Sequence, residues 1–220
     1  MPLCLRPGIS FCRVGDRLIF LDIVADRYFC LSADAENSFV QLTAGADKPA
    51  PDGVAHLVAQ GLLIERPDGV APAPCIPPDD PEGSLLDGPL PRVGLLPVMT
   101  ALHAIGIARL RVKALGLNAV LAAIERRKGR ISGVPMDRPA HVARTVAAFE
   151  RASRIATALD DCLNQSVAVA ARLLTQGLRP DLVLGVRLGP FNAHCWVQYK
   201  DQLVNDRLDM VRMFTPILVV

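Results

Sequence analysis

Short hydrophobic segments separated by turn residues near the N-terminus predict a small antiparallel sheet. The segments Ile9–Val14, Leu18–Val24 and Arg27–Leu31 are rich in β-branched and aromatic residues. The dipeptides Gly15–Asp16 and Ala25–Asp26 separate these segments and are typical of tight turns. We therefore expect a three-stranded meander over residues 9–31.

Helical periodicity follows in two short segments. The first runs to about Thr43 and can be capped by Ser32 or Asp34, and its hydrophobic residues repeat at helical spacing. The second segment, 53–60, follows a possible cap at Asp52 and precedes a glycine that can end it. Leu62–Glu65 and Val70 then flank a Pro-Asp-Gly turn and predict a small β-wing. Residues 1–72 thus form a small predicted domain, near the lower size limit for independent folding.

A proline-rich stretch separates the two halves of the chain. Nine of the 18 prolines lie between Pro67 and Pro97, together with Asp79, Asp80 and Glu82. Proline removes backbone donors and opposes regular helix and strand. We expect residues 73–91 to be an interdomain linker.

The second half, 92–220, predicts an α+β domain. Three helices are expected first, over Val93–Lys113, Leu115–Lys128 and Ala140–Leu159, with a break near Gly116. A fourth and strongly apolar helix, Cys162–Gln176, precedes three strands. The expected strands are Leu182–Arg187, Ala193–Tyr199 and Gln202–Asp206, with turns at Gly189–Pro190 and Lys200–Asp201.

Composition places the chain among folded globular proteins, since 51% of its residues are hydrophobic and 21% are charged. Its six cysteines include no CxxC pair, which argues against a zinc ribbon and against a disulfide framework. His56, His103 and His141 have no partners at metal-ligand spacing, so no metal is expected. The start MPLCLRPGIS lacks a basic region followed by an apolar run, and we expect a cytoplasmic protein.

Charge is unevenly distributed along the chain. Residues 1–91 carry a net charge of −7, and residues 92–154 carry +9. The negative charge of the first segment argues against nucleic-acid binding there. The basic run Glu125–Arg130 has two open interpretations: a solvated helix end, or a contact surface for an acidic leader peptide or partner. The apolar stretch Val93–Ala108 is shorter than the roughly 20 residues of a spanning helix, so no transmembrane span is expected.

Candidate chemistry lies in the last 60 residues, where Cys162 begins a helix, His194 lies on a strand and Asp206 lies on the next strand. A helix N-terminus and an imidazolium partner can lower the pKa of a thiol and make it a nucleophile. Histidine can act as base for the thiol and as acid for the leaving amine. The aspartate can fix the tautomer and orientation of the ring.

The strand pairing tests this interpretation. A three-residue loop, Tyr199–Lys200–Asp201, would place His194 opposite Asp206 on one face of the sheet. A two-residue loop would place them on opposite faces, because a slip of one residue inverts every side chain. The triad therefore predicts the longer loop.

Two neighbours of the candidate nucleophile and base have structural interpretations. Cys195 should point to the opposite face from His194 and be a small buried hydrophobic residue. Asp161 is expected to be the N-cap of the helix that starts at Cys162. The charges of Asp160 and Asp161 would oppose ionisation of the thiol.

Four segments carry a family resemblance: Cys162–Leu174 (CLNQSVAVAARLL), Gly185–Phe191 (GVRLGPF), Ala193–Val197 (AHCWV) and Val204–Asp206 (VND). Together they resemble the lasso-peptide B protein family, closely over residues 145–215 and loosely over the whole chain. The resemblance implies a papain/transglutaminase-like domain that removes the leader of a ribosomally made precursor with a Cys162–His194–Asp206 triad. Cys195 departs from the small residue, such as alanine, that is common in the family.

The same resemblance implies roles for the rest of the chain. Residues 1–72 match the plan of a PqqD-like, winged-helix-like domain that binds the leader peptide, for which an exposed strand edge is suitable. The implied partners are the precursor peptide and an asparagine-synthetase-like macrolactam synthetase. ATP dependence is a family trait, but no GxxxxGK[ST] motif for binding ATP occurs. The alternatives are a non-catalytic peptide-binding scaffold and a transglutaminase-like acyl transferase.

Overall fold

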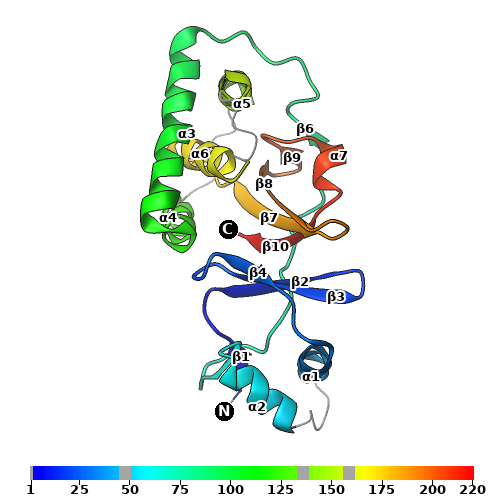
Figure 1. Cartoon of the computed structure of the whole chain (residues 1–220). Helices are drawn as coiled ribbons and strands as arrows, with labels where there is room; N and C mark the ends of the chain where they lie inside the picture. Colours follow the sequence, from blue (N-terminus) through cyan, green and yellow to red (C-terminus); the bar gives the residue numbers. More distant parts are fainter. Residues whose placement is uncertain (1, 45–50, 133–138, 156–161) are drawn as a thin grey trace. The chain divides into compact units, whose positions relative to one another are not determined.

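The computed structural model describes residues 2–44, 51–132, 139–155 and 162–220. The chain folds into two units, Met1–Ile76 and Pro77–Val220, and both combine helices with mainly antiparallel sheet (Figure 1). The prediction of an α+β protein is therefore confirmed.

The predicted meander is present in the first unit as β2 (Ile9–Val14), β3 (Arg17–Asp22) and β4 (Arg27–Phe29), in the order β2-β3-β4. Strand β3 ends two residues earlier than expected. The reason is that the Asp22 carboxylate accepts the N–H groups of Val24 and Ala25, which turns the chain.

Two helices and a second small sheet complete this unit. Helix α1 (Ala33–Thr43) has the predicted cap, because the Ser32 hydroxyl accepts the N–H of Ala35, and α2 spans Pro51–Ala59. The predicted β-wing is wrong: β5 (Leu63–Glu65) pairs with β1 (Leu3–Leu5), and Val70 is exposed outside any strand. The core contains three aromatic rings in mutual contact, those of Phe11, Phe20 and Phe39.

Four longer helices of the second unit are α3 (Leu95–Leu115), α4 (Leu117–Gly129), α5 (Pro139–Ile155) and α6 (Cys162–Thr175). The predicted break between α3 and α4 occurs at Gly116, which has φ +81° and so adopts a backbone that other residues rarely accept. Gly177 lies two residues after the end of α6 and has φ +77°, so a glycine closes this helix as expected.

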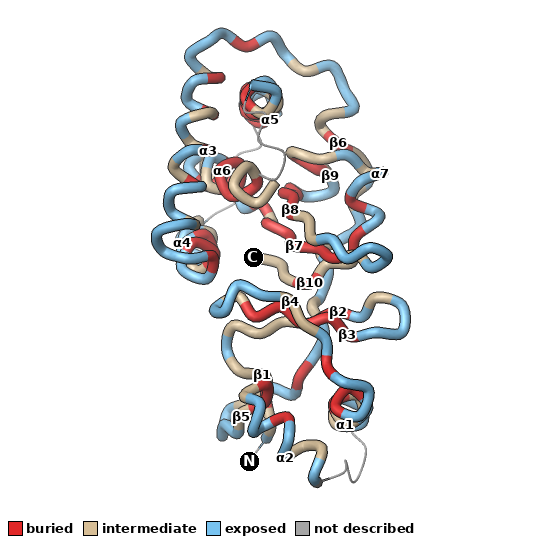
Figure 2. Tube along the Cα trace, viewed as in Figure 1, coloured by how far each residue is buried: buried red, intermediate tan, exposed pale blue. Residues whose placement is uncertain are grey.

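A five-stranded sheet packs beside α6 in the order β10-β7-β8-β9-β6 (Figure 1). Its strands are β6 (Gly83–Ser84), β7 (Asp181–Arg187), β8 (Asn192–Tyr199), β9 (Gln202–Leu203) and β10 (Thr215–Val219). The short helix α7 (Leu208–Val211) connects β9 to β10. Buried positions are concentrated in α6, β7 and β8, where the helix covers the sheet (Figure 2).

The predicted linker 73–91 is not a simple spacer. Its strand β6 pairs in parallel with β9, through Gly83–Gln202 and Ser84–Leu203. Two residues without proline are sufficient for this pairing, so the expectation that proline excludes strand from the whole stretch is wrong. The division between the two units lies after Ile76.

Helix α3 is longer than the stretch 93–108 considered in the sequence, because it continues to Leu115. Over the described residues, it is the one helix long and apolar enough to cross a membrane by length and composition. The helix expected over Val93–Lys113 agrees with α3 to within two residues at each end. In the second unit α3 packs against α5 and α6, and Val98, Ala101 and Ile105 are among its buried residues.

Candidate active site

The three residues predicted as a triad are brought together in the second unit. Cys162 is the first residue of α6, His194 lies on β8 and Asp206 follows the end of β9. The His194 Nε2 atom is hydrogen-bonded to Asp206 Oδ2, and the Cys162 thiol is hydrogen-bonded to the imidazole. Because Nε2 is used by the carboxylate, Nδ1 is the ring nitrogen that remains for Sγ.

The surroundings of Cys162 favour its thiolate. Burial opposes ionisation and would raise the pKa of the thiol. The hydrogen bond and the charge of His194 outweigh that effect, with help from the backbone N–H groups of Cys195 and Leu163. The pKa of Cys162 is consequently lower than its ordinary value, as nucleophilic cysteines require.

The same contacts favour the protonated form of His194. Burial would lower the pKa of the imidazole, but its hydrogen bonds to Asp206 and Cys162, and the charges of both partners, raise that pKa to about 9. Both shifts favour a thiolate beside an imidazolium, a state that combines a ready nucleophile with a ready proton donor.

The hairpin that contains His194 and leads to Asp206 has a different register from the predicted one. Tyr199 pairs with Gln202 and Gln198 with Leu203, so the loop contains two residues, with Lys200 at φ +56°. The predicted three-residue loop is wrong. A continued ladder in this register would place Asp206 on the face opposite His194.

Asp206 reaches His194 because the chain leaves the ladder after Leu203. Val204 still donates its N–H to the Val197 carbonyl. At the next position the Asn205 side chain replaces a backbone partner, since its Oδ1 accepts the Val197 N–H at 2.8 Å. The segment then bends, and Asp206 is free to turn towards the imidazole.

A buried polar network fixes this bend to the nucleophile helix. Asn205 Nδ2 donates to Ser166 Oγ at 2.9 Å, and Ser166 Oγ donates to the Cys195 carbonyl at 2.8 Å. Ser166 is fully buried and lies one helical turn after Cys162. The network therefore connects the helix of the nucleophile, the strand of the histidine and the segment of the aspartate.

Strand β6 holds the aspartate from the other side. Ser84 Oγ donates to the backbone carbonyl of Asp206 at 2.5 Å and accepts the Leu86 N–H. The Arg207 N–H also donates to Asp206 Oδ1. Part of the predicted linker thus helps to position the candidate triad.

Aromatic side chains enclose the imidazole of His194. The ring of Phe214 lies 5.0 Å from it and the ring of Trp196 lies 6.2 Å away, measured between centroids. Gly185 pairs with His194 across the sheet, and a Cβ there would lie 2.6 Å from the Trp196 ring. Glycine at this position therefore makes room for the aromatic wall.

Two expectations about neighbouring residues have different outcomes. Cys195 is buried as predicted, and burial, with a contribution from the charge of Cys162, raises the pKa of its thiol far above the ordinary value. Its thiol is thus an unreactive one. Asp160 and Asp161, the latter expected to be the helix cap, lie outside the described residues.

The first unit presents a separate feature on β4. Among the described strands β4 pairs with β3 alone, whereas the outer strand β2 has the Phe11 carbonyl engaged by the Cys75 N–H. A cavity of about 340 Å³ lies beside β4, and Arg27, Phe29 and Gln60 are among its lining residues. The outer strand of a sheet next to a cavity can accept an extended peptide.

Sequence reasoning missed Ser84, Ser166, Asn205 and Gly185 as site residues. A serine one turn after the cysteine in an otherwise apolar helix is a signal that could have identified Ser166. No comparable signal exists for Ser84, since its partner is 122 residues away. Across the described ranges, no group of three or more His, Cys, Asp or Glu side chains could hold a metal ion.

Comparison with known proteins identifies a partial relative and a superfamily. A stretch of 50 residues is 40% identical to the microcin J25-processing protein McjB of Escherichia coli, and it covers 23% of this chain and 24% of that protein. The chain thus matches about a quarter of the length of this relative. No solved structure matches the chain. The transglutaminase-like superfamily matches residues 104–219, which is more than half of the chain and includes all three residues of the site, so the chain belongs to the transglutaminase-like superfamily.

Proposed function

We propose that this protein is a cysteine peptidase that binds and removes the leader of a ribosomally made lasso-peptide precursor before macrolactam cyclisation. The observation that carries the proposal is the contact of Cys162, His194 and Asp206 within a transglutaminase-like domain. The partial likeness to a microcin-processing protein favours a peptide substrate over other acyl compounds.

The proposed reaction follows from the protonation state of the site. The Cys162 thiolate attacks the carbonyl carbon at the leader–core junction, and the His194 imidazolium gives its proton to the leaving amine. The amine departs as the N-terminus of the core, and the leader remains as a thioester on Sγ. Neutral His194 then takes a proton from water, whose oxygen attacks the thioester and releases the leader carboxylate. Asp206 keeps the ring oriented through both steps.

The first unit is the proposed site of leader recognition. The position of β4 as the last strand of its sheet and the adjacent cavity support strand addition by an extended peptide. The exposed Arg27 lies at this edge, and Arg13 is exposed on β2. In a titration of labelled leader, Arg27→Glu should lower the affinity of the full chain and Arg13→Glu should not. Equal affinities for both variants would exclude this edge as the leader site.

Mass spectrometry of a precursor peptide tests the reaction itself. The protein is incubated with precursor, with and without ATP and an asparagine-synthetase-like macrolactam synthetase, the proposed partner enzyme. Cleavage at one junction by the wild type but not by Cys162→Ala supports the peptidase. An unchanged precursor mass under every condition would indicate a peptide-binding scaffold. An increase equal to an added amine would indicate an acyl transferase.

A further inference from the structure

Strand β8 is paired along only part of the edge that faces β9. The ladder between these two strands ends at the pair Gln198–Leu203. The backbone N–H and C=O groups of successive residues in a strand point alternately to its two neighbours. Val197 directs both groups to the β9 side, since its N–H bonds to Asn205 and its carbonyl to Val204. The odd-numbered residues of β8 therefore present their backbone groups on this edge.

The two remaining odd-numbered residues of β8 differ in their partners. Cys195 donates its N–H to the Cys162 thiol, and its carbonyl accepts the Ser166 hydroxyl. Ala193 lies opposite Val186 of β7, and by the same alternation this pair has no ladder bonds. The Ala193 N–H and C=O have no hydrogen-bond partner among the residues that the structure describes, and the residue is only half-buried. Ala193 thus presents an accessible donor and acceptor side by side.

This donor and acceptor lie next to the reacting sulfur. Ala193 and Cys195 are two residues apart in β8, which is about 7 Å along the strand. Cys195 in turn contacts Cys162 Sγ through its N–H. A peptide that pairs with Ala193 in an extended conformation therefore has a carbonyl carbon near Sγ within one or two residues. In an antiparallel pair, a single residue exchanges both hydrogen bonds with its partner.

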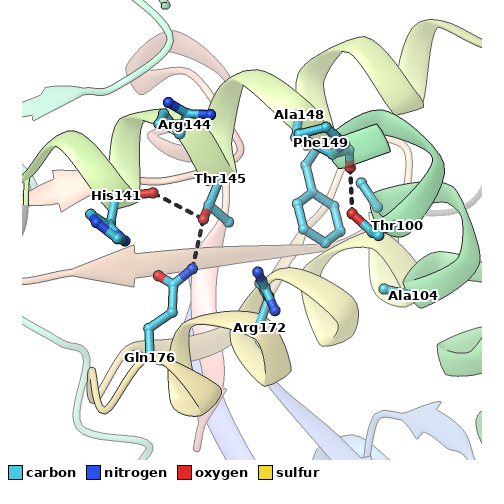
Figure 3. Close-up of a pocket in the computed structure, with 11 residues that line it drawn as sticks. Thr100, Ala104, His141, Arg144, Thr145, Ala148, Phe149, Arg172 and Gln176 are labelled. Carbon is cyan, nitrogen blue, oxygen red and sulfur yellow. Dashed lines mark hydrogen bonds between the residues drawn. The ribbon is translucent and has the colours of Figure 1, made fainter. Parts of the chain in front are cut away.

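The pocket between α3, α5 and α6 is too distant for this role. Its volume is about 440 Å³, and Arg172 and Gln176 line it from α6 (Figure 3). Arg172 follows Cys162 by ten residues, which is about 15 Å along the helix axis. A substrate residue held there would be about four residues or more from the bond at Sγ. The edge of β8 is the closer place to align that bond.

We propose that the backbone of Ala193 binds the backbone of the peptide substrate and so aligns the bond that Cys162 attacks. One substrate residue donates its N–H to the Ala193 carbonyl, and its own carbonyl accepts the Ala193 N–H. These bonds select an extended backbone and not a particular side chain, so they set the register of the peptide at the junction. The inference rests on the proposed peptidase function.

Replacing single amides of the precursor by esters tests this inference with the wild-type protein. Each synthetic precursor has one ester near the junction, at a bond other than the scissile one, and so lacks one N–H. We expect kcat/KM to fall about tenfold at one position, where the N–H donates to Ala193, and to stay within about threefold at the others. Failure to cleave the unmodified precursor would overturn the proposed function and this inference with it. Equal kcat/KM values for all esters would overturn this inference alone.

The variant Ala193→Pro removes the other hydrogen bond, because proline has no N–H. This N–H is not part of the ladder with β7, so the strand should keep its pairing. We expect kcat/KM to fall about tenfold. The sensitive ester should cost less than about threefold in this variant, because the two bonds belong to one residue pair. Ala193→Ser keeps the N–H and is the matched control, expected within about threefold of the wild type.

Alkylation by iodoacetamide shows whether the triad is intact in Ala193→Pro. This small reagent has no peptide chain, and its reaction with Cys162 depends on the thiolate. Mass spectrometry of the tryptic fragment that contains Cys162 follows the reaction, and the variant should react within about twofold of the wild-type rate. A parallel loss of alkylation and cleavage would mean that Ala193 supports the thiolate and not the substrate. That outcome, or cleavage by Ala193→Pro at the wild-type rate, would overturn the inference.

Discussion

Replacing Asn205 by alanine removes two hydrogen bonds at the point where the chain leaves the sheet. The N–H of Val197, a fully buried residue, loses its acceptor, and Ser166 Oγ loses the donor Nδ2. A buried N–H without a partner costs about 1–3 kcal/mol, and the lost bond to Ser166 costs about 1 kcal/mol because Ser166 still donates to the Cys195 carbonyl. The Asn205→Ala variant should therefore lose about 2–4 kcal/mol of unfolding free energy.

Urea unfolding followed by tryptophan fluorescence measures this loss. Trp196 is the only tryptophan of the chain and is buried beside Val197, so the signal reports on the second unit alone. The urea midpoint should fall with little change in slope. The matched control is Asn192→Ala, at the exposed start of β8, which should change stability by less than about 0.5 kcal/mol. A loss below about 1 kcal/mol for Asn205→Ala would refute the argument that this side chain replaces a ladder bond.

Three further predictions concern the site. Cys162→Ala should abolish precursor cleavage with an unchanged circular dichroism spectrum, whereas Cys195→Ala should retain most of the rate; the opposite result would assign the wrong nucleophile. The single-turnover rate should fall above about pH 9, as His194 loses the proton that it gives to the leaving amine. It should also fall in acid, at a pH below the ordinary pKa of cysteine, because the Cys162 thiolate is protonated there; a rate that rises through pH 9 would contradict the ion pair. Gly185→Ala should destabilise the second unit by about 1–3 kcal/mol in urea, because the new Cβ overlaps the Trp196 ring, and a neutral effect would show that the ring can move.

Local signals explain which parts of the fold could be predicted. The meander over residues 9–29 has strong β-forming segments and turn dipeptides, and α1 has a serine cap, so each element is specified by its own residues. Gly116 and Gly177 likewise mark real helix ends, because each has a positive φ. Strands β1 and β6 are only three and two residues long and depend on partners far along the chain. Such pairing leaves no periodic pattern to detect.

The residues of the candidate site were predicted from their chemical types, but the hairpin register that was predicted with them was wrong. The order of Cys162, His194 and Asp206, together with the family resemblance, selected residues that are in contact. The hairpin register was wrong because a two-residue and a three-residue loop fit the same local pattern. With the two-residue loop, Asp206 still reaches His194 because the Asn205 side chain replaces one backbone acceptor where the chain bends. Side-chain bonds of this kind arise only when the helix and the sheet have packed.

The role of Asp206 can be separated from that of a nearby surface charge. The hydrogen bond and charge of Asp206 help to raise the pKa of His194 to about 9. Asp206→Asn keeps a side chain of the same shape but removes the charge, so the pKa of His194 should fall. The alkaline limb of the rate profile should then move to lower pH. The neutral amide also favours the wrong ring tautomer, a change that costs about ten-thousandfold in serine proteases. A thiol depends less on a strong base, so we expect a loss of about ten- to a thousandfold.

Asp209→Asn is the matched control for this prediction. Asp209 lies three residues further on in α7, is exposed, and has no hydrogen bond to the imidazole. Its variant should stay within about threefold of the wild-type rate, with an unmoved alkaline limb. Single-turnover cleavage of saturating precursor across the alkaline range measures both quantities. If Asp206 had only a structural role, Asp206→Asn would lower the rate without moving the alkaline limb of the pH–rate profile. This outcome would remove Asp206 from the proposed mechanism. If Asp209→Asn lost most of the cleavage rate and Asp206→Asn did not, the orienting carboxylate would be that of Asp209 in α7.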